Sequence, residues 1–200
     1  MRHGEREGDQ LTALGTRQVS ASAEANLAGT RYLLAFHTGM TRTYQTAETI
    51  LSTLEGAGSL TPRAEEGFGV VWALNQKWPI QTAQDQIKSL VASGAAETAA
   101  LWTSSWPPAL AILGRFLGTL EKWTTYAAMR AAEDGSPVGD GVRFLVASHS
   151  PCAELAALDP SATPRLGPAD GITYEIEVDI RNLGIVITSS EVWRCPEGVE

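Results

Sequence analysis

The chain contains three histidines, and two of them have neighbours suited to handling a phosphate group. His3 stands between Arg2 and Gly4, and His149 follows directly after a short apolar run. Arg42 comes a few residues after another apolar run. A neutral imidazole can attack phosphorus as a nucleophile, and the planar guanidinium donors of arginine match phosphate oxygens. These residue types predict a site that binds and transfers a phosphoryl group.

The predicted elements bring His149 and Arg42 toward one crevice. Residues 31–37 and 144–148 are apolar runs with the length of buried parallel strands. Arg42 opens a predicted helix after the first strand, and His149 lies between the second strand and a helix predicted for residues 151–158. In open α/β sheets, ligands bind at the carboxyl ends of the strands, where helix N-termini also favour anions. We therefore expect both side chains to point into the same anion site.

Hydrophobic spacing predicts the remaining elements, and strands that alternate with helices indicate an α/β fold. Alternation of apolar and polar residues over 172–178, followed by a second strand over 183–189, is typical of an antiparallel hairpin. The expected architecture is a three-layer sandwich with a mostly parallel central sheet, helices on both faces and an antiparallel edge hairpin. Residues 1–200 are expected to form one domain with a helical, tryptophan-rich insert at 67–132. The other predicted elements are helices at 10–28 (capped by Thr12), 41–54, 80–93 and 107–132, and a strand at 60–66.

The composition limits the partners that the chain can bind. It has 15 Lys and Arg against 23 Asp and Glu, a net charge of -8, so the basic surface that nucleic acids and anionic membranes require is absent. Neither Cys152 nor Cys195 lies in a metal-binding pattern, and both are expected to be free thiols. No metal and no cofactor is implied. Because no apolar run has membrane-spanning length and no signal peptide is visible, the expected location is the cytoplasm.

Several short motifs follow one another in a fixed order along the chain. Together they resemble the histidine phosphatase (phosphoglycerate mutase-like) superfamily, in its acid-anhydride and phosphomonoester phosphatase branch. One departure is Thr38, which stands where the family usually has serine. The matching segments are Arg2-His3-Gly4-Glu5 for the RHG signature, Leu11-Thr12 with Gly15 and Gln18 for LTxxGxxQ, Thr38 to Glu48 for SxxxRxxQTAE, Glu65 to Gly69 for the acidic loop, and Ala147 to Pro151 for the second histidine.

The resemblance implies a phosphatase that hydrolyses a phosphomonoester through a phosphohistidine intermediate. His3 would be the nucleophile that attacks phosphorus in line. Arg2, Arg42 and His149 would surround the equatorial oxygens, bind the substrate phosphate and stabilise the transferring group. This chemistry needs no metal ion.

The resemblance also implies a general acid in the acidic loop. Glu65 is the catalytic acid that the alignment favours, because it lies four residues before Gly69. Glu66 is the alternative acid and a substrate-binding residue. Thr38 is expected to offer its hydroxyl or its backbone N–H to the phosphate.

The family places its signature histidine at the end of a first, central strand, whereas Met1 directly precedes Arg2 in this sequence. Removing a central strand would leave the backbone groups of its neighbours unpaired, which is costly in a buried sheet. Three explanations are open. Residues upstream of the numbered sequence supply the strand, another segment fills the gap, or the chain is a truncated relative.

Two alternative functions share the same site. A phosphoglycerate mutase-type phosphotransferase uses the same chemistry, but the short run between Glu5 and Leu11 and the absence of an ERHYG acidic loop argue against it. A catalytically inactive relative would bind a phospho-ligand without turnover. The expected substrate is a phosphorylated small molecule or a phosphoprotein. The edge of the hairpin at 172–189 could pair with a second copy to give a homodimer.

Overall fold

The central sheet is parallel and has β3 in its middle. The computed structural model describes residues 1–54, 60–69, 80–106, 108–133, 142–179 and 184–199. β3 (Leu34–His37) pairs on one side with β4 (Arg63–Ala64) and on the other with β5 (Phe144–Ala147), in the order β4-β3-β5. Phe36 lies opposite Val146 in the register of β3 and β5. The carboxyl ends of all three strands therefore reach the same edge of the sheet.

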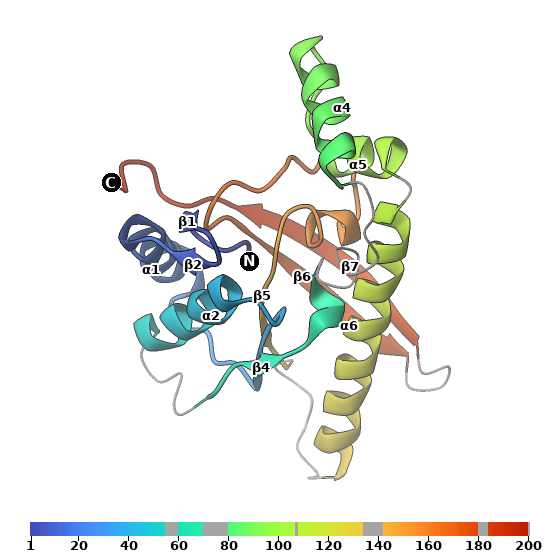
Figure 1. Ribbon diagram of the computed structural model, residues 1–200. Coiled ribbons are helices and arrows are strands. Elements are labelled where there is room, and N and C mark those ends of the chain that lie inside the picture. The colour runs from blue at the N-terminus through green and yellow to red at the C-terminus, as the bar shows by residue number, and fades with distance from the viewer. Residues whose placement is uncertain (55–59, 70–79, 107, 134–141, 180–183, 200) are drawn as a thin grey trace.

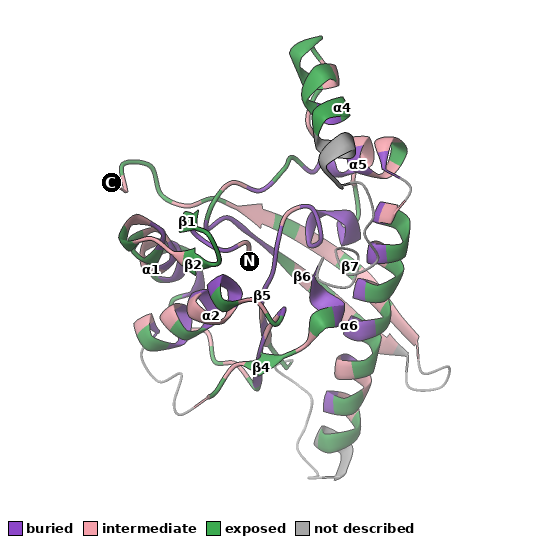
Figure 2. Cartoon of the chain, in the orientation of Figure 1, coloured by how far each residue is buried: buried purple, intermediate pink, exposed green. Residues whose placement is uncertain are grey.

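Helices cover both faces of this sheet, as the sequence predicted (Figure 1). α1 (Ala13–Leu27) and α2 (Thr41–Thr53) pack on one face, where Ala35 and Leu145 join their core. α6 (Pro108–Glu133) lies on the other face. Side chains alternate across a strand, so Leu34 and Phe36 pack on the α6 side while Ala35 packs against α1 and α2. Figure 2 shows the same division, with buried residues along the strands and along one side of α6.

Met1–His3 fills the place of the strand that the sequence did not reveal. The Met1 nitrogen donates to the Val146 carbonyl at 2.7 Å, and the Ser148 N–H donates to the Met1 carbonyl at 2.8 Å. Arg2 and Ser148 form a parallel bridge beyond the end of β5. This short segment therefore pairs with the edge of β5 that β3 leaves open.

The other side of this segment is bonded too. The Arg2 N–H donates to the Asp170 carbonyl at 2.9 Å, and the Ala169 N–H donates to the His3 carbonyl at 3.2 Å. The Asp170 carboxylate accepts from the backbone of Gly167 and Cys195 and forms an ion pair with Arg194. Arg2 and His3 are therefore held between β5 and residues 166–170.

The predicted hairpin is confirmed, with longer strands than expected. β6 (Gly171–Asp179) and β7 (Gly184–Trp193) pair antiparallel, with an irregularity between Glu175 and Ile176. They form a separate two-stranded sheet beside α6 rather than an edge of the central sheet. The remaining elements are β1 (Arg6–Glu7), β2 (Gln10–Leu11), α4 (Ile80–Ala92), α5 (Ala99–Ser105) and two short 3-10 helices, η1 (Glu66–Phe68) and η3 (Glu154–Ala156).

The helix predicted for residues 151–158 is wrong, because only η3 forms there. The segment from Pro151 to Ala157 is buried, and the Glu154 carboxylate accepts the Leu166 N–H at 2.9 Å. Tertiary contacts of this kind override helix propensity in a short segment. The strand predicted at 60–66 is reduced to the two residues of β4. The insert contains α4, α5 and α6, but its residues 70–79, with Trp72 and Trp78, lie outside the described residues.

Two motif glycines allow α1 to contact the loop that follows His3. A Cβ on Gly4 would lie 2.3 Å from the Gly15 carbonyl oxygen, and a Cβ on Gly15 would lie 2.0 Å from the Glu5 carbonyl oxygen. Thr12 caps α1 as predicted, since its hydroxyl accepts the Gly15 N–H at 2.9 Å. The backbones thus touch where the RHG and LTxxG motifs meet. No helix among the described residues is long and apolar enough to cross a membrane.

We expect Gly15→Ala to lower the free energy of unfolding by about 1–3 kcal/mol, because the new methyl group overlaps the Glu5 carbonyl. The matched control is Gly118→Ala in α6, where a Cβ meets nothing within 4 Å. Helix propensity alone should make that variant more stable by roughly 0.5–1 kcal/mol. Urea denaturation of both variants measures the difference. Equal gains in stability would contradict the close packing of Gly15.

Candidate active site

The ring of His3 is held in the form that a nucleophile needs. Its Nδ1 lies 2.7 Å from the Gly4 carbonyl oxygen, which can only accept, so Nδ1 carries the proton and Nε2 keeps its lone pair. Burial, together with the charges of Arg42 and Arg2, lowers the pKa of His3 from 6.5 to about 4. The imidazole is therefore neutral at pH 7, and its Nε2 has a free lone pair.

His149 lies beside His3 and is neutral as well. The ring centroids are 5.4 Å apart in an edge-on arrangement. The Nε2 of His149 lies 2.8 Å from Thr38 Oγ1, while its Nδ1 is buried without a hydrogen-bond partner in the described structure. Burial, followed by the charge of Arg42, lowers the pKa of His149 to about 2. An unpartnered buried nitrogen beside the nucleophile marks a place for a ligand atom.

Arg42 reaches the same place from the first turn of α2. Its side chain is only 10% exposed, and its Nη1 donates to Asp9 Oδ1 at 2.6 Å. Its Nε is buried and finds no partner among the described residues. Because the charge of Arg42 lowers the pKa of both His3 and His149, the guanidinium lies within electrostatic reach of both rings.

Sequence reasoning did not find Asp9, which fixes Arg42. The carboxylate accepts the Thr41 N–H at 3.0 Å as well as the Arg42 bond, so it joins the loop after His3 to the start of α2. Burial would raise the pKa of Asp9, but these hydrogen bonds bring it below its ordinary value. The residue lies in the short run before Leu11, and no spacing within that run points to a partner 33 positions away.

Arg2 lies near both histidines, and one of its guanidinium nitrogens is already bonded to the protein. Its Nη1 donates to the Leu166 carbonyl, and its charge lowers the pKa of His3 and of His149. Arg6 acts on His3 in the same direction, and it is a second residue that the sequence analysis did not single out. The structure thus gathers positive charge around the histidine pair.

Thr38 directs both of its polar groups to protein partners. Its N–H donates to Thr43 Oγ1 at 3.2 Å, and its hydroxyl lies between Thr43 Oγ1 and His149 Nε2. The side chain is fully buried, with Gly69 so close that a Cβ there would lie 2.6 Å from the Thr38 Cβ. This arrangement does not favour the direct contact with substrate that the sequence predicted.

The two acidic-loop glutamates have different surroundings. Glu65 Oε2 accepts from Lys122 Nζ at 2.8 Å and from Trp123 Nε1 at 3.0 Å, both on α6. Burial would raise the pKa of Glu65, but these bonds bring it below its ordinary value. Glu66 is exposed, and its Cγ lies 3.7 Å from the Cβ position of Gly39, the residue after Thr38. Glu66 is therefore the carboxylate beside the loop that leads into α2.

The arrangement suits an anion rather than a cation. Within the described ranges, no three His, Cys, Asp or Glu side chains are grouped so that they could hold a metal ion. Guanidinium groups offer donors instead, among them the unpartnered Arg42 Nε, and the unpartnered His149 Nδ1 can donate in one of its two tautomers. Such donors match the oxygens of a phosphoryl group.

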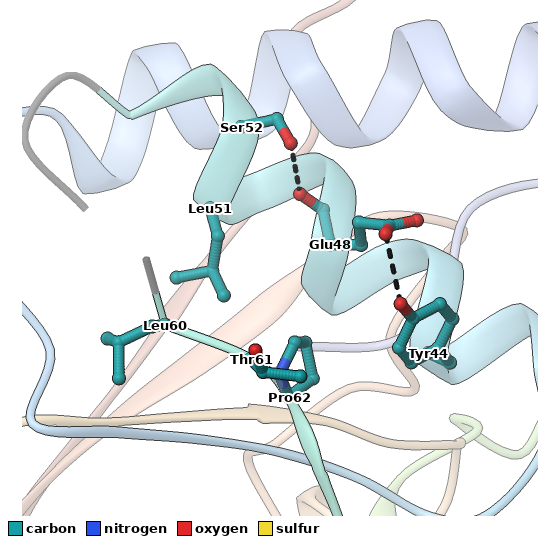
Figure 3. A pocket seen from close by; sticks show the side chains of 7 residues that line it. All are labelled: Tyr44, Glu48, Leu51, Ser52, Leu60, Thr61 and Pro62. Atoms are coloured by element: carbon teal, nitrogen blue, oxygen red, sulfur yellow. Dashed lines mark hydrogen bonds between the residues drawn. The ribbon is translucent and has the colours of Figure 1, made fainter. Parts of the chain in front are cut away.

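A separate hollow of about 230 Å³ lies along α2 and is not lined by any of these side chains. Figure 3 shows that Glu48, in the middle of its lining, is hydrogen-bonded to two of its neighbours. Tyr44 donates from its hydroxyl to Glu48 Oε1 at 3.0 Å, and Ser52 donates to the Glu48 carbonyl at 2.8 Å. We therefore place the chemistry at the histidine pair.

Comparison with known proteins establishes the fold. No protein-family model and no curated protein matches the chain. A solved structure called mycobacterial hydrolase 1 has a TM-score of 0.59 and 16% identity over 98% of this chain and 96% of that chain. Native mycobacterial glucosyl-3-phosphoglycerate phosphatase has a TM-score of 0.58 and 18% identity, covering 97% and 96%. Its complex with inorganic phosphate has a TM-score of 0.56 and 19% identity, covering 100% and 96%. The phosphoglycerate mutase-like fold that the motifs predicted is confirmed.

The histidine pair should make stability depend on pH. Both folded-state pKa values lie below the unfolded value of about 6.5, so the stabilising contribution is complete above pH 6.5 and is lost as the pH falls toward 4. We expect the free energy of unfolding to fall by about 1 kcal/mol per pH unit for each histidine once the pH is below 6. Urea denaturation at pH 6.5, 5.5 and 4.5 measures this slope. The double variant His3→Gln with His149→Gln is the control, and an unchanged slope in it would contradict the burial of neutral rings.

Proposed function

We propose that this chain, which has the fold of the histidine phosphatase superfamily, is a phosphatase that hydrolyses a phosphomonoester through a phosphohistidine on His3. The observation that carries the proposal is the bond from His3 Nδ1–H to the Gly4 carbonyl, because it leaves Nε2 as a buried, neutral nucleophile. Beside it, Arg42 and His149 each keep a buried nitrogen for which the described residues offer no partner. A nucleophile next to unsatisfied donors is what in-line phosphoryl transfer requires.

In the first step, His3 Nε2 attacks phosphorus and forms an N–P bond while the P–O bond to the substrate alcohol breaks. Arg42 and His149 would hold the equatorial oxygens, and the charge of Arg2 would help to stabilise them. The departing alkoxide takes a proton from the acidic-loop carboxyl group and leaves as the alcohol. The enzyme then carries a phosphohistidine and a carboxylate.

In the second step, water attacks the phosphohistidine and the same carboxylate accepts its proton. The N–P bond breaks, inorganic phosphate is released, and His3 returns to its neutral form with a proton on Nδ1. Neither step needs a metal ion or an external oxidant or reductant. Because hydrolysis reverses the roles of the first step, a single carboxyl group serves as acid and then as base.

We propose Glu66 as this acid and base. Glu65 accepts hydrogen bonds from Lys122 and Trp123, which stabilise the carboxylate and make it a poor proton donor. Glu66 is exposed and lies beside Gly39, at the carboxyl end of β3. Glu65 then has a positioning role, since its bonds join the acidic loop to α6.

The substrate is proposed to be a phosphorylated small molecule or a phosphoprotein. One structural neighbour acts on glucosyl-3-phosphoglycerate, as its name states, so phosphate esters of sugars and hydroxy acids belong in the first assays. Cys152 and Cys195 are both free, which accords with the proposed cytoplasmic location.

We expect His3→Ala to lower phosphate release from para-nitrophenyl phosphate by at least about 10⁴-fold, because no other group can form the intermediate. The wild-type protein should form an acid-labile phosphoprotein on rapid quenching, and the variant should not. Protection of the variant by vanadate against thermal unfolding checks that its anion site is still folded. Substantial turnover by His3→Ala would rule out the nucleophile. Vanadate protection of a wild-type protein that turns over no phosphoester would indicate a binding protein.

Substrates with different leaving groups can show whether Glu65 or Glu66 is the general acid. Loss of a general acid costs about 10²- to 10⁴-fold when the leaving alkoxide needs protonation, and much less for para-nitrophenolate. We expect Glu66→Gln to lower kcat strongly for alkyl phosphates and much less for para-nitrophenyl phosphate. Glu65→Gln is the matched control and should lower both rates by similar factors. The opposite pattern would assign the acid to Glu65.

A further inference from the structure

A buried chain of hydrogen bonds connects His149 to the loop before α2. His149 Nε2 lies 2.8 Å from Thr38 Oγ1, which lies 3.1 Å from Thr43 Oγ1, which lies 2.8 Å from the Met40 carbonyl oxygen. Thr38 and Thr43 have no exposed surface, and His149 is 4% exposed. Because water does not reach these atoms, each proton in the chain has a small set of acceptors.

Counting the protons leaves two possible chains of hydrogen bonds. The hydroxyl of Thr43 has one proton, which the Met40 carbonyl accepts, and its oxygen already accepts the Thr38 N–H. The hydroxyl proton of Thr38 can then go to Thr43 Oγ1 or to His149 Nε2. If it goes to Thr43, the Nε2–H donates to Thr38 Oγ1, and the 2.8 Å contact fits either direction. Only donation from Thr38 to Nε2 puts the ring proton on Nδ1, the nitrogen that has no partner among the described residues.

We propose that Thr38 is a positioning residue that sets the tautomer of His149: its hydroxyl donates to Nε2, so that the ring proton is on Nδ1. Nδ1 is the buried nitrogen for which the described residues provide no partner. With the proton there, it becomes a donor to a phosphoryl oxygen. In the other tautomer, Nδ1 would direct a lone pair at the anion. As far as the anion is concerned, this inference rests on the proposed function.

The surroundings of His149 keep its ring neutral, so its role depends on which ring nitrogen carries the proton. Burial, followed by the charge of Arg42, keeps His149 uncharged, while Asp9 acts in the opposite direction. His149 therefore acts through a directed N–H rather than through charge. Serine at position 38 would supply the same hydroxyl, whereas valine has the same shape without it.

The tautomer can be measured directly by NMR of protein labelled with ¹⁵N histidine. Two-bond ¹H–¹⁵N correlations distinguish Nδ1–H from Nε2–H rings, and the three histidines of the chain can be assigned with single variants. We expect the Nδ1–H pattern for His149 with and without vanadate. Thr38→Val should lose this pattern and Thr38→Ser should keep it. An Nε2–H ring in the wild-type protein, or an unchanged pattern in Thr38→Val, would overturn the proposal.

Thr43→Val is the sharpest control, because the two possible chains predict opposite results. If Thr38 donates to His149, removing the Thr43 hydroxyl takes away the competing acceptor and leaves the Nδ1–H pattern in place. If His149 donates through Thr38 to Thr43, the same change removes the end of the chain and shifts the tautomer. The wild-type and Thr43→Val spectra therefore test the proposal even if Thr38→Val does not fold.

Kinetics give a second readout, which a loss of packing alone would not produce. A donor that acts mainly in the transition state affects kcat, so Thr38→Val should lower kcat on the order of 10²-fold with little change in KM, and Thr38→Ser should restore it. Equal kcat values for wild-type and Thr38→Val protein would contradict the role. Should the protein lack phosphatase activity altogether, the proposed function fails, but the spectra without vanadate still decide the tautomer.

Discussion

The site depends on the backbone bonds that hold Met1–His3 between β5 and residues 169–170. Neighbouring strands lie about 4.8 Å apart, so pairing this segment with Ser148 brings the side chains of His3 and His149 to the same edge of the sheet. Their ring centroids are 5.4 Å apart as a result. A bond on each side also prevents the segment from shifting in register. Backbone geometry thus fixes the position of His3, the proposed nucleophile.

The local charge of the site is opposite to the charge of the whole chain. The net charge is -8, yet Arg2, Arg6 and Arg42 all act on His3, and Asp9 is the carboxylate bonded to Arg42. Gathering cations has a cost, but it suits a bound dianion, whose lost hydration is replaced by fixed donors. The same charges, with burial, keep both histidines neutral. A single arrangement therefore favours an anion and leaves His3, the proposed nucleophile, unprotonated.

The sequence could predict residues whose position follows from local pattern. Apolar runs identified β3 and β5, and residues directly after them, Arg42 and His149, had to lie at one edge of the sheet. Contacts between distant positions left no local signal. Asp9 to Arg42 spans 33 positions, Glu65 to Trp123 spans 58, and Thr38 to His149 spans 111. The place of His3 and the loss of the helix after His149 both depend on such contacts with residues 166–170.

The unpartnered atoms explain why the second histidine is useful beside an arginine. Arg42 already donates to Asp9 and keeps Nε for the anion, and as a cation it attracts phosphate from any direction. His149 is neutral, so its contribution falls off when the acceptor moves out of line with the N–H. A charged donor binds substrate and transition state alike, whereas a directed neutral donor can favour the geometry in which the phosphoryl oxygens flatten during transfer. If Thr38 donates to Nε2 as proposed, its hydroxyl would supply this selectivity by placing the ring proton on Nδ1.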